Sequence, residues 1–269
     1  MKTQAVLASI AISAAALAQT SAYYVTQGTS GPGKTWVMQN GQIQFNYNWA
    51  ADGQMPIAIG DFGQGLRVRQ ACGQPTSGNP QQGDEYLLNG TPTGYTNFWN
   101  SGDPPNTTAY DATFDGTHIY MVHWLGATDG QVFMYDKNYA NGQFLFNARS
   151  GDIGITYDSK TNSLWTSNWN DGKVTQWSMN GTQLFQYQPF PVGVAALAYD
   201  PVDDTFWMSI SATGLLEQHD RNGTFLQSYR WPDYVLGGEI AVVPEPVSVL
   251  AFGAGLAALA LKRRLSSRG

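Results

Sequence analysis

The side chains that could perform acid–base or metal chemistry in this chain are few. Only three histidines are present, His118, His123 and His219, and no two of them have the spacing that places a pair of zinc ligands on one helix. The single cysteine, Cys72, excludes an intramolecular disulfide and a cysteine-rich metal cluster. The sequence also lacks a nucleophile elbow, a P-loop and a dinucleotide-binding glycine motif. The remaining candidates are carboxylates.

Three carboxylates, Asp111, Asp152 and Glu239, stand at or near the starts of short apolar segments that are typical of strands. If these strands line the axis of a ring-shaped fold, the three side chains converge on one central channel. Oxygen ligands of this kind can hold Ca²⁺, so a divalent cation is one interpretation. An acidic channel mouth solvated by water is the other. No residue is predicted to be catalytic, no other cofactor is expected, and a non-enzymatic role is favoured.

A repeat determines where these residues must lie. Residues 151–187 recur 42 positions downstream, at residues 193–229, without a gap. The matched pairs include Gly151/Gly193, Tyr157/Tyr199, Asp158/Asp200, Trp165/Trp207, Asn180/Asn222 and Gly181/Gly223. A period of about 40 to 45 residues that carries four short apolar runs is typical of a propeller blade.

Each repeat predicts four strands. In the first copy they lie at residues 153–157, 163–167, 173–178 and 183–188. All are rich in β-branched or aromatic residues and are bounded by turn residues. Asp171-Gly172 is predicted to close the middle hairpin and Asn180-Gly181 the outer one, and both pairs predict type I′ turns.

The rest of the chain supplies further blades. Residues 108–148 follow the pattern with small drifts in spacing, and residues 52–102 follow it loosely. Residues 23–49 offer only three strands, whereas residues 238–243 offer one, so we expect the last strand to complete the first blade at its innermost position. The sequence thus predicts an all-β propeller of about five four-stranded blades, closed by pairing of its N- and C-terminal strands. Four or six blades are the alternatives.

The Tyr-Asp, Leu-Trp, Gly-x-Val and Asn-Gly-Thr steps of residues 151–229 resemble those of NHL-type and YVTN-type propellers. The resemblance extends more weakly over residues 23–243. It implies a fold and no particular activity, because those families serve binding, scaffolding and catalysis alike. Gluconolactonase-like propellers use Glu, Asn and Asp around a central metal, so Asp111, Asp152 and Glu239 would be metal ligands in a lactonase, but the local motifs of that family are not matched.

Two further sets of residues have structural interpretations. Trp165 and Trp207 occupy matching strand positions, where such rings either stack on sugars or fill the space between blades. We expect both to be buried. The Asp-Gly pairs at Asp115, Asp129 and Asp171 could ligate calcium, but each stands where a hairpin needs a turn, and we interpret them as turns.

The N-terminal residues 1–22 have the pattern of a secretory signal peptide. Lys2 is followed by an uncharged run and then by small residues suited to cleavage. The exported domain would therefore comprise residues 23–243. It contains nine Lys and Arg against nineteen Asp and Glu, a net charge of −10, which disfavours nucleic acid as a partner.

The C-terminal residues 244–269 combine Pro244-Glu245-Pro246, an uncharged run at 247–261, and Lys262-Arg263-Arg264. This order resembles the PEP-CTERM sorting signal of Gram-negative bacteria. The resemblance implies transient anchoring by a transmembrane helix in the inner membrane, with the basic end in the cytoplasm. It also implies processing near the Pro-Glu-Pro motif by an exosortase and transfer to the cell surface or the medium. An ordinary membrane anchor is the alternative.

Together these features predict an exported cell-envelope propeller that acts as a binding or scaffold protein. Exopolysaccharide or another envelope component is the expected ligand, and a purely structural surface or matrix protein is a further hypothesis. The alternative function is that of a metal-dependent lactonase or hydrolase.

Overall fold

The structure is a computed structural model that describes residues 19–28, 32–73, 82–98, 107–124, 130–211, 213–231 and 233–244. The chain divides into two units. One is Ala22–Ala241, and the other combines Met1–Ser21 with Val242–Gly269. The second unit is described only at residues 19–21 and 242–244, the ends of two strands.

The residues predicted to carry export and sorting signals fall mostly in undescribed parts of the chain. Residues 1–18 of the predicted signal peptide and all of the predicted sorting signal after Pro244 lie outside the described residues. A membrane-spanning helix is not found among the residues that the structure describes.

The described residues form twenty strands in five four-stranded antiparallel sheets. From the innermost strand outward, the sheets are β20 (Val235–Pro244), β1 (Gln19–Gln27), β2 (Lys34–Gln39) and β3 (Gln42–Asn48); β4 (Ile57–Asp61), β5 (Leu66–Gln70), β6 (Gln82–Tyr86) and β7 (Pro92–Phe98); β8 (Thr108–Phe114), β9 (His118–Trp124), β10 (Gly130–Asp136) and β11 (Gln143–Ala148); β12 (Asp152–Asp158), β13 (Ser163–Asn168), β14 (Val174–Ser178) and β15 (Gln183–Tyr187); β16 (Val194–Asp200), β17 (Thr205–Ile210), β18 (Leu215–Asp220) and β19 (Phe225–Arg230).

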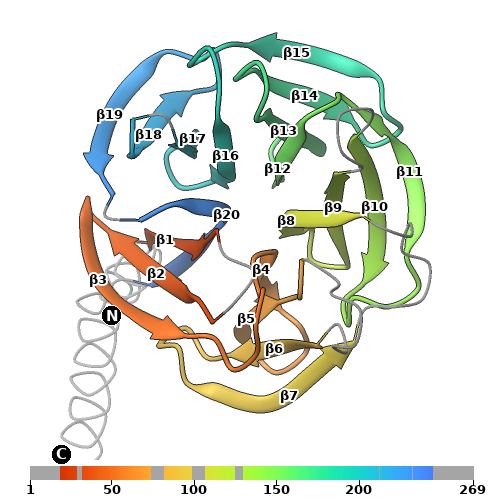
Figure 1. Ribbon diagram of the computed structural model, residues 1–269, viewed down its shortest axis with the longest axis vertical. Coiled ribbons are helices and arrows are strands. Elements are labelled where there is room, and N and C mark those ends of the chain that lie inside the picture. Colours follow the sequence, from red (N-terminus) through yellow and green to blue (C-terminus); the bar gives the residue numbers. More distant parts are fainter. Residues whose placement is uncertain are drawn as a thin grey trace, which may run out of the picture. The chain divides into compact units, whose positions relative to one another are not determined.

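The five sheets of Ala22–Ala241 are the blades of a propeller (Figure 1), with β20, β4, β8, β12 and β16 nearest the centre and β3, β7, β11, β15 and β19 on the rim. The predicted number of blades is confirmed. Residues at the ends of β4, β8, β12 and β16 line one common depression, so these innermost strands end at one face of the ring and begin at the opposite face.

The first blade is closed by strands from the two ends of the domain. β20 lies beside β1 in the same sheet and takes the innermost position. Gly28 N donates a hydrogen bond to Tyr234 O at 2.7 Å, and Gly237 N donates to Thr26 Oγ1 at 3.1 Å. The predicted closure is therefore confirmed, although β1 begins at Gln19, before the predicted strand start at residue 23.

The hairpin turns before and after β14 differ from the predicted type I′ turns. Gly172 and Gly181 have positive φ values of 66° and 84°, but Asp171 and Asn180 are not among the residues with positive φ, so neither pair forms the predicted type I′ turn. The turn between β14 and β15 is longer, because Ser178 accepts a hydrogen bond from Gly181 N and donates one from its own N to Thr182 O, and the ladder shifts register between Gln176 and Trp177. Such longer loops are built around a type I turn and need only one positive φ. By contrast, Asn40 and Gly41 both have positive φ, 51° and 71°.

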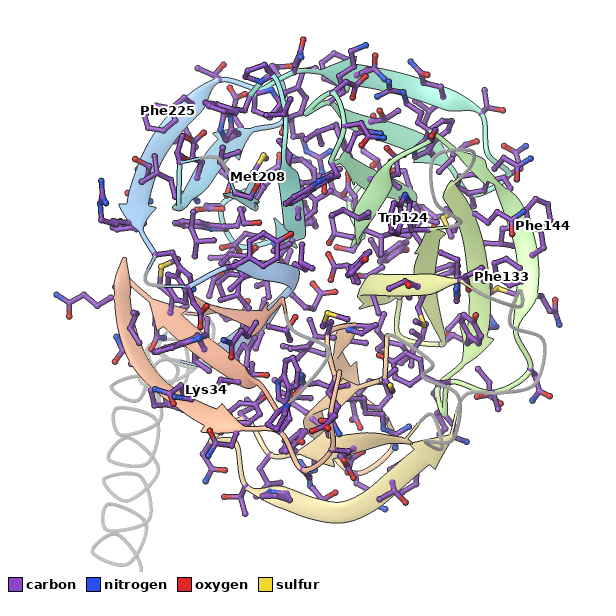
Figure 2. All side chains as sticks on the ribbon, in the orientation of Figure 1. Lys34, Trp124, Phe133, Phe144, Met208 and Phe225 are labelled. Carbon is purple, nitrogen blue, oxygen red and sulfur yellow. The ribbon has the colours of Figure 1, made fainter. Side chains whose placement is uncertain are left out.

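Aromatic rings fill the space between neighbouring blades. Trp165 on β13 and Trp207 on β17 are 1% and 7% exposed, which confirms the expected burial. The Trp165 ring lies 4.5 Å from the ring of Phe206, which belongs to the next blade. The outer strands differ: Phe144 on β11 and Phe225 on β19 are about half exposed and lie on the rim (Figure 2).

Candidate functional site

Hydrogen bonds between innermost strands occupy the central axis. Asp111 on β8 is fully buried. Its Oδ1 accepts bonds from Ala112 N at 3.0 Å and from Gly238 N at 2.9 Å, and its Oδ2 accepts one from Ile155 N at 3.2 Å. Backbone donors to a carboxylate make strong bonds. One side chain thus joins β8, β12 and β20 across the axis.

Glu239 on β20 lies close enough to Asp111 for the two charges to interact. Its Oε1 accepts a bond from Ile240 N at 3.0 Å, and the hydroxyl of Thr113 donates a bond to its side chain. Burial raises the pKa of Glu239 to about 8, because a carboxylate loses its hydration inside the protein. Burial, reinforced by the charge of Glu239, also raises the pKa of Asp111 well above its ordinary value.

The third predicted carboxylate, Asp152 on β12, is held by residues of its own blade. It accepts hydrogen bonds from Arg149 N at 3.1 Å, Thr166 Oγ1 at 2.7 Å and Asn168 Nδ2 at 2.7 Å. Burial raises the pKa of Asp152 to about 6. The structure therefore brings Asp111 and Glu239 together and gives Asp152 separate partners.

The histidines and carboxylates give no support for a metal centre. Across the described ranges, no group of three or more His, Cys, Asp or Glu side chains could hold a metal ion. His123 is buried between Thr107 Oγ1 and Tyr135 OH, and burial lowers the pKa of its imidazole to about 3. His219 bonds to Glu217. These contacts are structural.

The Asp-Gly pairs within the described residues serve turns. Asp115 Oδ1 accepts bonds from the backbone N of Thr117 and of His118. Asp171 forms an ion pair with Arg149. Burial tends to raise the pKa of Asp171, but hydrogen bonds from Arg149 and Lys173 together with the Arg149 charge hold it below its ordinary value. The third pair, at Asp129, lies outside the described residues.

A depression of about 340 Å³ lies at the face where the innermost strands end. Every innermost strand contributes to its lining, with Ile59, Thr113, Tyr157, Tyr199 and Glu239. The depression therefore lies on the propeller axis. The buried carboxyl of Glu239 forms part of its wall.

At the opposite face, where the innermost strands begin, aromatic side chains gather around the axis. Trp124 ends β9, Trp169 follows β13, Tyr110 lies near the start of β8, and Tyr234 immediately precedes β20. We call these four residues the aromatic patch. Trp124, Trp169 and Tyr110 are partly exposed, and Tyr234 is 43% exposed.

The rings of the aromatic patch form a continuous group. The ring centroids of Tyr110 and Trp124 are 6.1 Å apart, and those of Trp169 and Tyr234 are 5.7 Å apart in an edge-to-face arrangement at 89°. Burial first, and then an electrostatic interaction with Tyr110, raise the pKa of Tyr234 to about 12. The group links four segments from three blades.

Buried apolar side chains support the aromatic patch from below. Tyr110, Trp124 and Trp169 pack against a cluster that includes Met55, Ile153, Ala195 and Leu236. Figure 2 shows Trp124 on the inner side of the ring, well away from the rim residue Phe144. The axis is therefore covered at this face by a rigid surface of partly exposed rings, each with an apolar face and a polar edge.

The aromatic patch was missed by the sequence reasoning, although a signal for it exists. Tyr120 and Trp165 are equivalent strand positions, 45 residues apart. The same offset relates Trp124 to Trp169. Trp124 and Trp169 stand at matching positions at the ends of the second strands of two blades, which indicates that both rings lie at the same face of the propeller.

Fold and geometry define the protein as a five-bladed β-propeller with Asp111 hydrogen-bonded across its axis and an aromatic patch at one face. No protein-family model matches the sequence. No curated protein sequence matches it.

Several solved structures are similar to this chain at low sequence identity. A chain from the crystal structure of a nidogen/laminin complex is 11% identical, with a TM-score of 0.53 over 82% of this chain and 98% of that chain. Apo AztD from Citrobacter koseri is 7% identical (TM-score 0.48; 84% and 99% of the chains), and virginiamycin B lyase from Staphylococcus aureus is 14% identical (TM-score 0.44; 80% and 75%). At such identities the likeness concerns the fold alone.

Proposed function

We propose that this protein is an exported glycan-binding β-propeller that presents the aromatic patch to an exopolysaccharide or another sugar polymer of the cell envelope. The observation that carries the proposal is the group of partly exposed rings of Tyr110, Trp124, Trp169 and Tyr234 over an apolar support. Sugar rings present C–H faces that stack on aromatic faces, while their hydroxyls bond to the polar edges of Tyr and Trp.

The alternative, a metal-dependent lactonase, would require converging oxygen ligands. Asp152 bonds to Thr166 and Asn168 of its own blade. Asp111 already accepts three backbone N–H groups. A binding role needs neither carboxylate at the surface, and we favour it for that reason.

Trp124→Ala and Trp169→Ala are each expected to weaken glycan binding about tenfold, because a well-placed aromatic contact contributes about 0.5 to 1.5 kcal/mol beyond its buried area. Glycan-array screening followed by calorimetry with the best ligand measures the change. Phe225→Ala is the matched control, since it removes an exposed ring from the rim. Unchanged affinity in both tryptophan variants would contradict the proposal.

We propose further that residues 1–22 direct export and that residues 244–269 anchor the protein transiently in the inner membrane until an exosortase removes the tail. The proposal rests on the order of Pro244-Glu245-Pro246, the uncharged run 247–261 and the basic end. The domain would then reach the cell surface or the medium.

Replacing Pro244-Glu245-Pro246 by alanines is expected to leave membrane insertion intact and to block processing, because the hydrophobic run and Lys262-Arg263-Arg264 still provide anchoring and orientation. Intact mass and tail-specific immunoblotting of envelope fractions distinguish the two forms in a host with an exosortase. An unrelated exported protein fused to residues 244–269 serves as the control and should be processed. A full-length C-terminus on the mature wild-type protein would make the tail an ordinary anchor.

A further inference from the structure

The closing strand β20 is held in the ring from two sides. Within its sheet it has one neighbour, β1. Toward the axis, Gly237 and Gly238 lie against the backbones of other blades. A Cβ atom at Gly237 would lie 2.3 Å from Met55 O, and one at Gly238 would lie 2.8 Å from Ala196 O. Only glycine permits such close approaches, so β20 has no room to shift within the axis.

Two buried carboxyls meet where β20 contacts β8. Asp111 Oδ1 accepts a hydrogen bond from Gly238 N of β20 at 2.9 Å, and Oδ2 accepts one from Ile155 N of β12 at 3.2 Å. The next residue of β20 is Glu239, whose side chain accepts a bond from the Thr113 hydroxyl of β8. We call Asp111 and Glu239 the axial pair. None of the ion pairs among the described residues includes either of them.

The other titratable groups near the axial pair do not offset its charge. Burial, and then the charges of the pair, raise the pKa of Tyr23 on β1. Burial also raises the pKa of Tyr139, which follows β10, against the opposing charge of Arg69, and Arg69 is itself paired with Glu85. Both tyrosines are therefore uncharged at pH 9. The depression that Glu239 lines contains no Lys, Arg or His.

Loss of a proton from the axial pair weakens the hold on β20. Two buried carboxyls without a cation cannot both ionise without cost, because like charges repel strongly where water does not screen them. Burial accordingly raises the pKa of Glu239 to about 8. Separation of β20 would hydrate Glu239 and restore its ordinary pKa of 4.5. The separated state is therefore favoured increasingly as the pH rises from about 4.5 to 8.

We propose that the axial pair is a pH-sensitive latch that controls whether β20 stays in the ring. While the pair holds a proton, Asp111 keeps β20 against β8 and β12. When both side chains are ionised, β20 separates from the axis while the other four blades remain folded. Separation also withdraws Leu236, a residue of β20, from beneath the aromatic patch. The latch does not depend on what the aromatic patch binds.

Amide hydrogen exchange of the full-length protein tests the latch, with EDTA present and with rates corrected for the intrinsic effect of pH. The amides of β20 are expected to lose protection by about a hundredfold or more between pH 5 and pH 8 and to change little above pH 8. The amides of β13 and β14 should open more rarely at each pH, because they lie in a blade that stays folded. Equal opening of β20 and β13 at every pH, or protection of β20 that does not depend on pH, would overturn the inference.

Glu239→Gln removes one titrating group and keeps the shape, so most of the pH dependence of β20 protection should disappear. Asp61→Asn is the matched control. It makes the same change of charge in the same depression, but at an exposed residue, and it should leave the pH dependence as in the wild type. Wild-type pH dependence in the Glu239→Gln variant would show that the axial pair is not the latch.

Thr113→Val keeps both carboxyls and removes a hydrogen bond that favours the ionised form of Glu239. The loss of β20 protection should therefore shift to higher pH. A purely structural role of this threonine would instead weaken β20 equally at every pH. A midpoint that is unshifted, or that moves to lower pH, would contradict the latch.

Discussion

Replacing Trp165 by alanine is expected to lower the free energy of unfolding by about 3 to 5 kcal/mol, the usual cost of deleting a large buried aromatic side chain. Trp165 is 1% exposed and packs against Phe206 of the next blade at 4.5 Å. Its Nε1 also donates a hydrogen bond to Asp158 Oδ2 at 3.3 Å. The substitution therefore removes packing between two blades together with one partner of a buried carboxylate.

Equilibrium denaturation in urea measures this loss of stability. The comparison is between the removal of a buried aromatic ring and the removal of an exposed one. Phe225→Ala is the control, because Phe225 is 52% exposed on an outer strand and surface substitutions usually change stability by less than about 0.5 kcal/mol. Equal losses in the two variants would show that the packing between blades does not limit stability.

Glu239→Gln is expected to make the protein more stable at pH 9 and to flatten its pH dependence. Burial raises the pKa of Glu239 from an ordinary value of 4.5 to about 8, so the folded state holds a proton that the unfolded state releases. The stability linked to this proton is present below about pH 4.5 and is lost as the pH rises toward 8. Each unit of pKa shift corresponds to about 1.4 kcal/mol, so the difference amounts to several kcal/mol.

Unfolding free energies of the wild-type protein and the Glu239→Gln variant, measured from pH 4 to pH 9, test this result. The two proteins should agree near pH 4, where Glu239 is protonated in both states, and diverge as the pH rises. Some slope should remain in the variant, because burial also raises the pKa values of Asp111 and Asp152. Parallel curves for the two proteins would mean that the Glu239 carboxyl is ionised in the folded state.

The repeat made the blades predictable because each blade is a local structure with its own turns and aromatic positions. Residues 151–187 carry all four strands of one blade, and the register of the second copy confirms their order. Three strands at the N-terminal end and one at the C-terminal end belong to no complete repeat. Together they make one four-stranded blade, which predicted how the ring closes. These inferences need only local pattern and strand counting.

The directions of individual side chains on the innermost strands could not be predicted in the same way. The β12–β13 ladder shifts register between Asp152 and Gly154, and the β8–β9 ladder shifts between Ala109 and Ala112. A bulge changes the direction of the side chains next to it. Residues at equivalent positions of two repeats therefore need not point the same way relative to the axis. Asp111 accordingly bonds across the axis, whereas Asp152 bonds within its own blade.

The aromatic patch lay beyond prediction for a different reason. Its members come from the end of β9, the residue after β13, the start of β8 and the residue before β20. Their proximity depends on how blades are placed around the ring. The offset shared by Trp124 and Trp169 could be read from the sequence, but the addition of Tyr110 and Tyr234 required the closed ring.

The position of β20 beside β1 has a consequence for the timing of folding. The first blade is begun by Gln19–Gln27 but receives its innermost strand, Val235–Pro244, about two hundred residues later. At a synthesis rate of about 5 to 20 residues per second, this separation corresponds to roughly 10 to 40 seconds. During that interval the inner edge of β1 has no neighbour, and an unpaired edge can bind other strands. The ring therefore cannot close until β20 has been made.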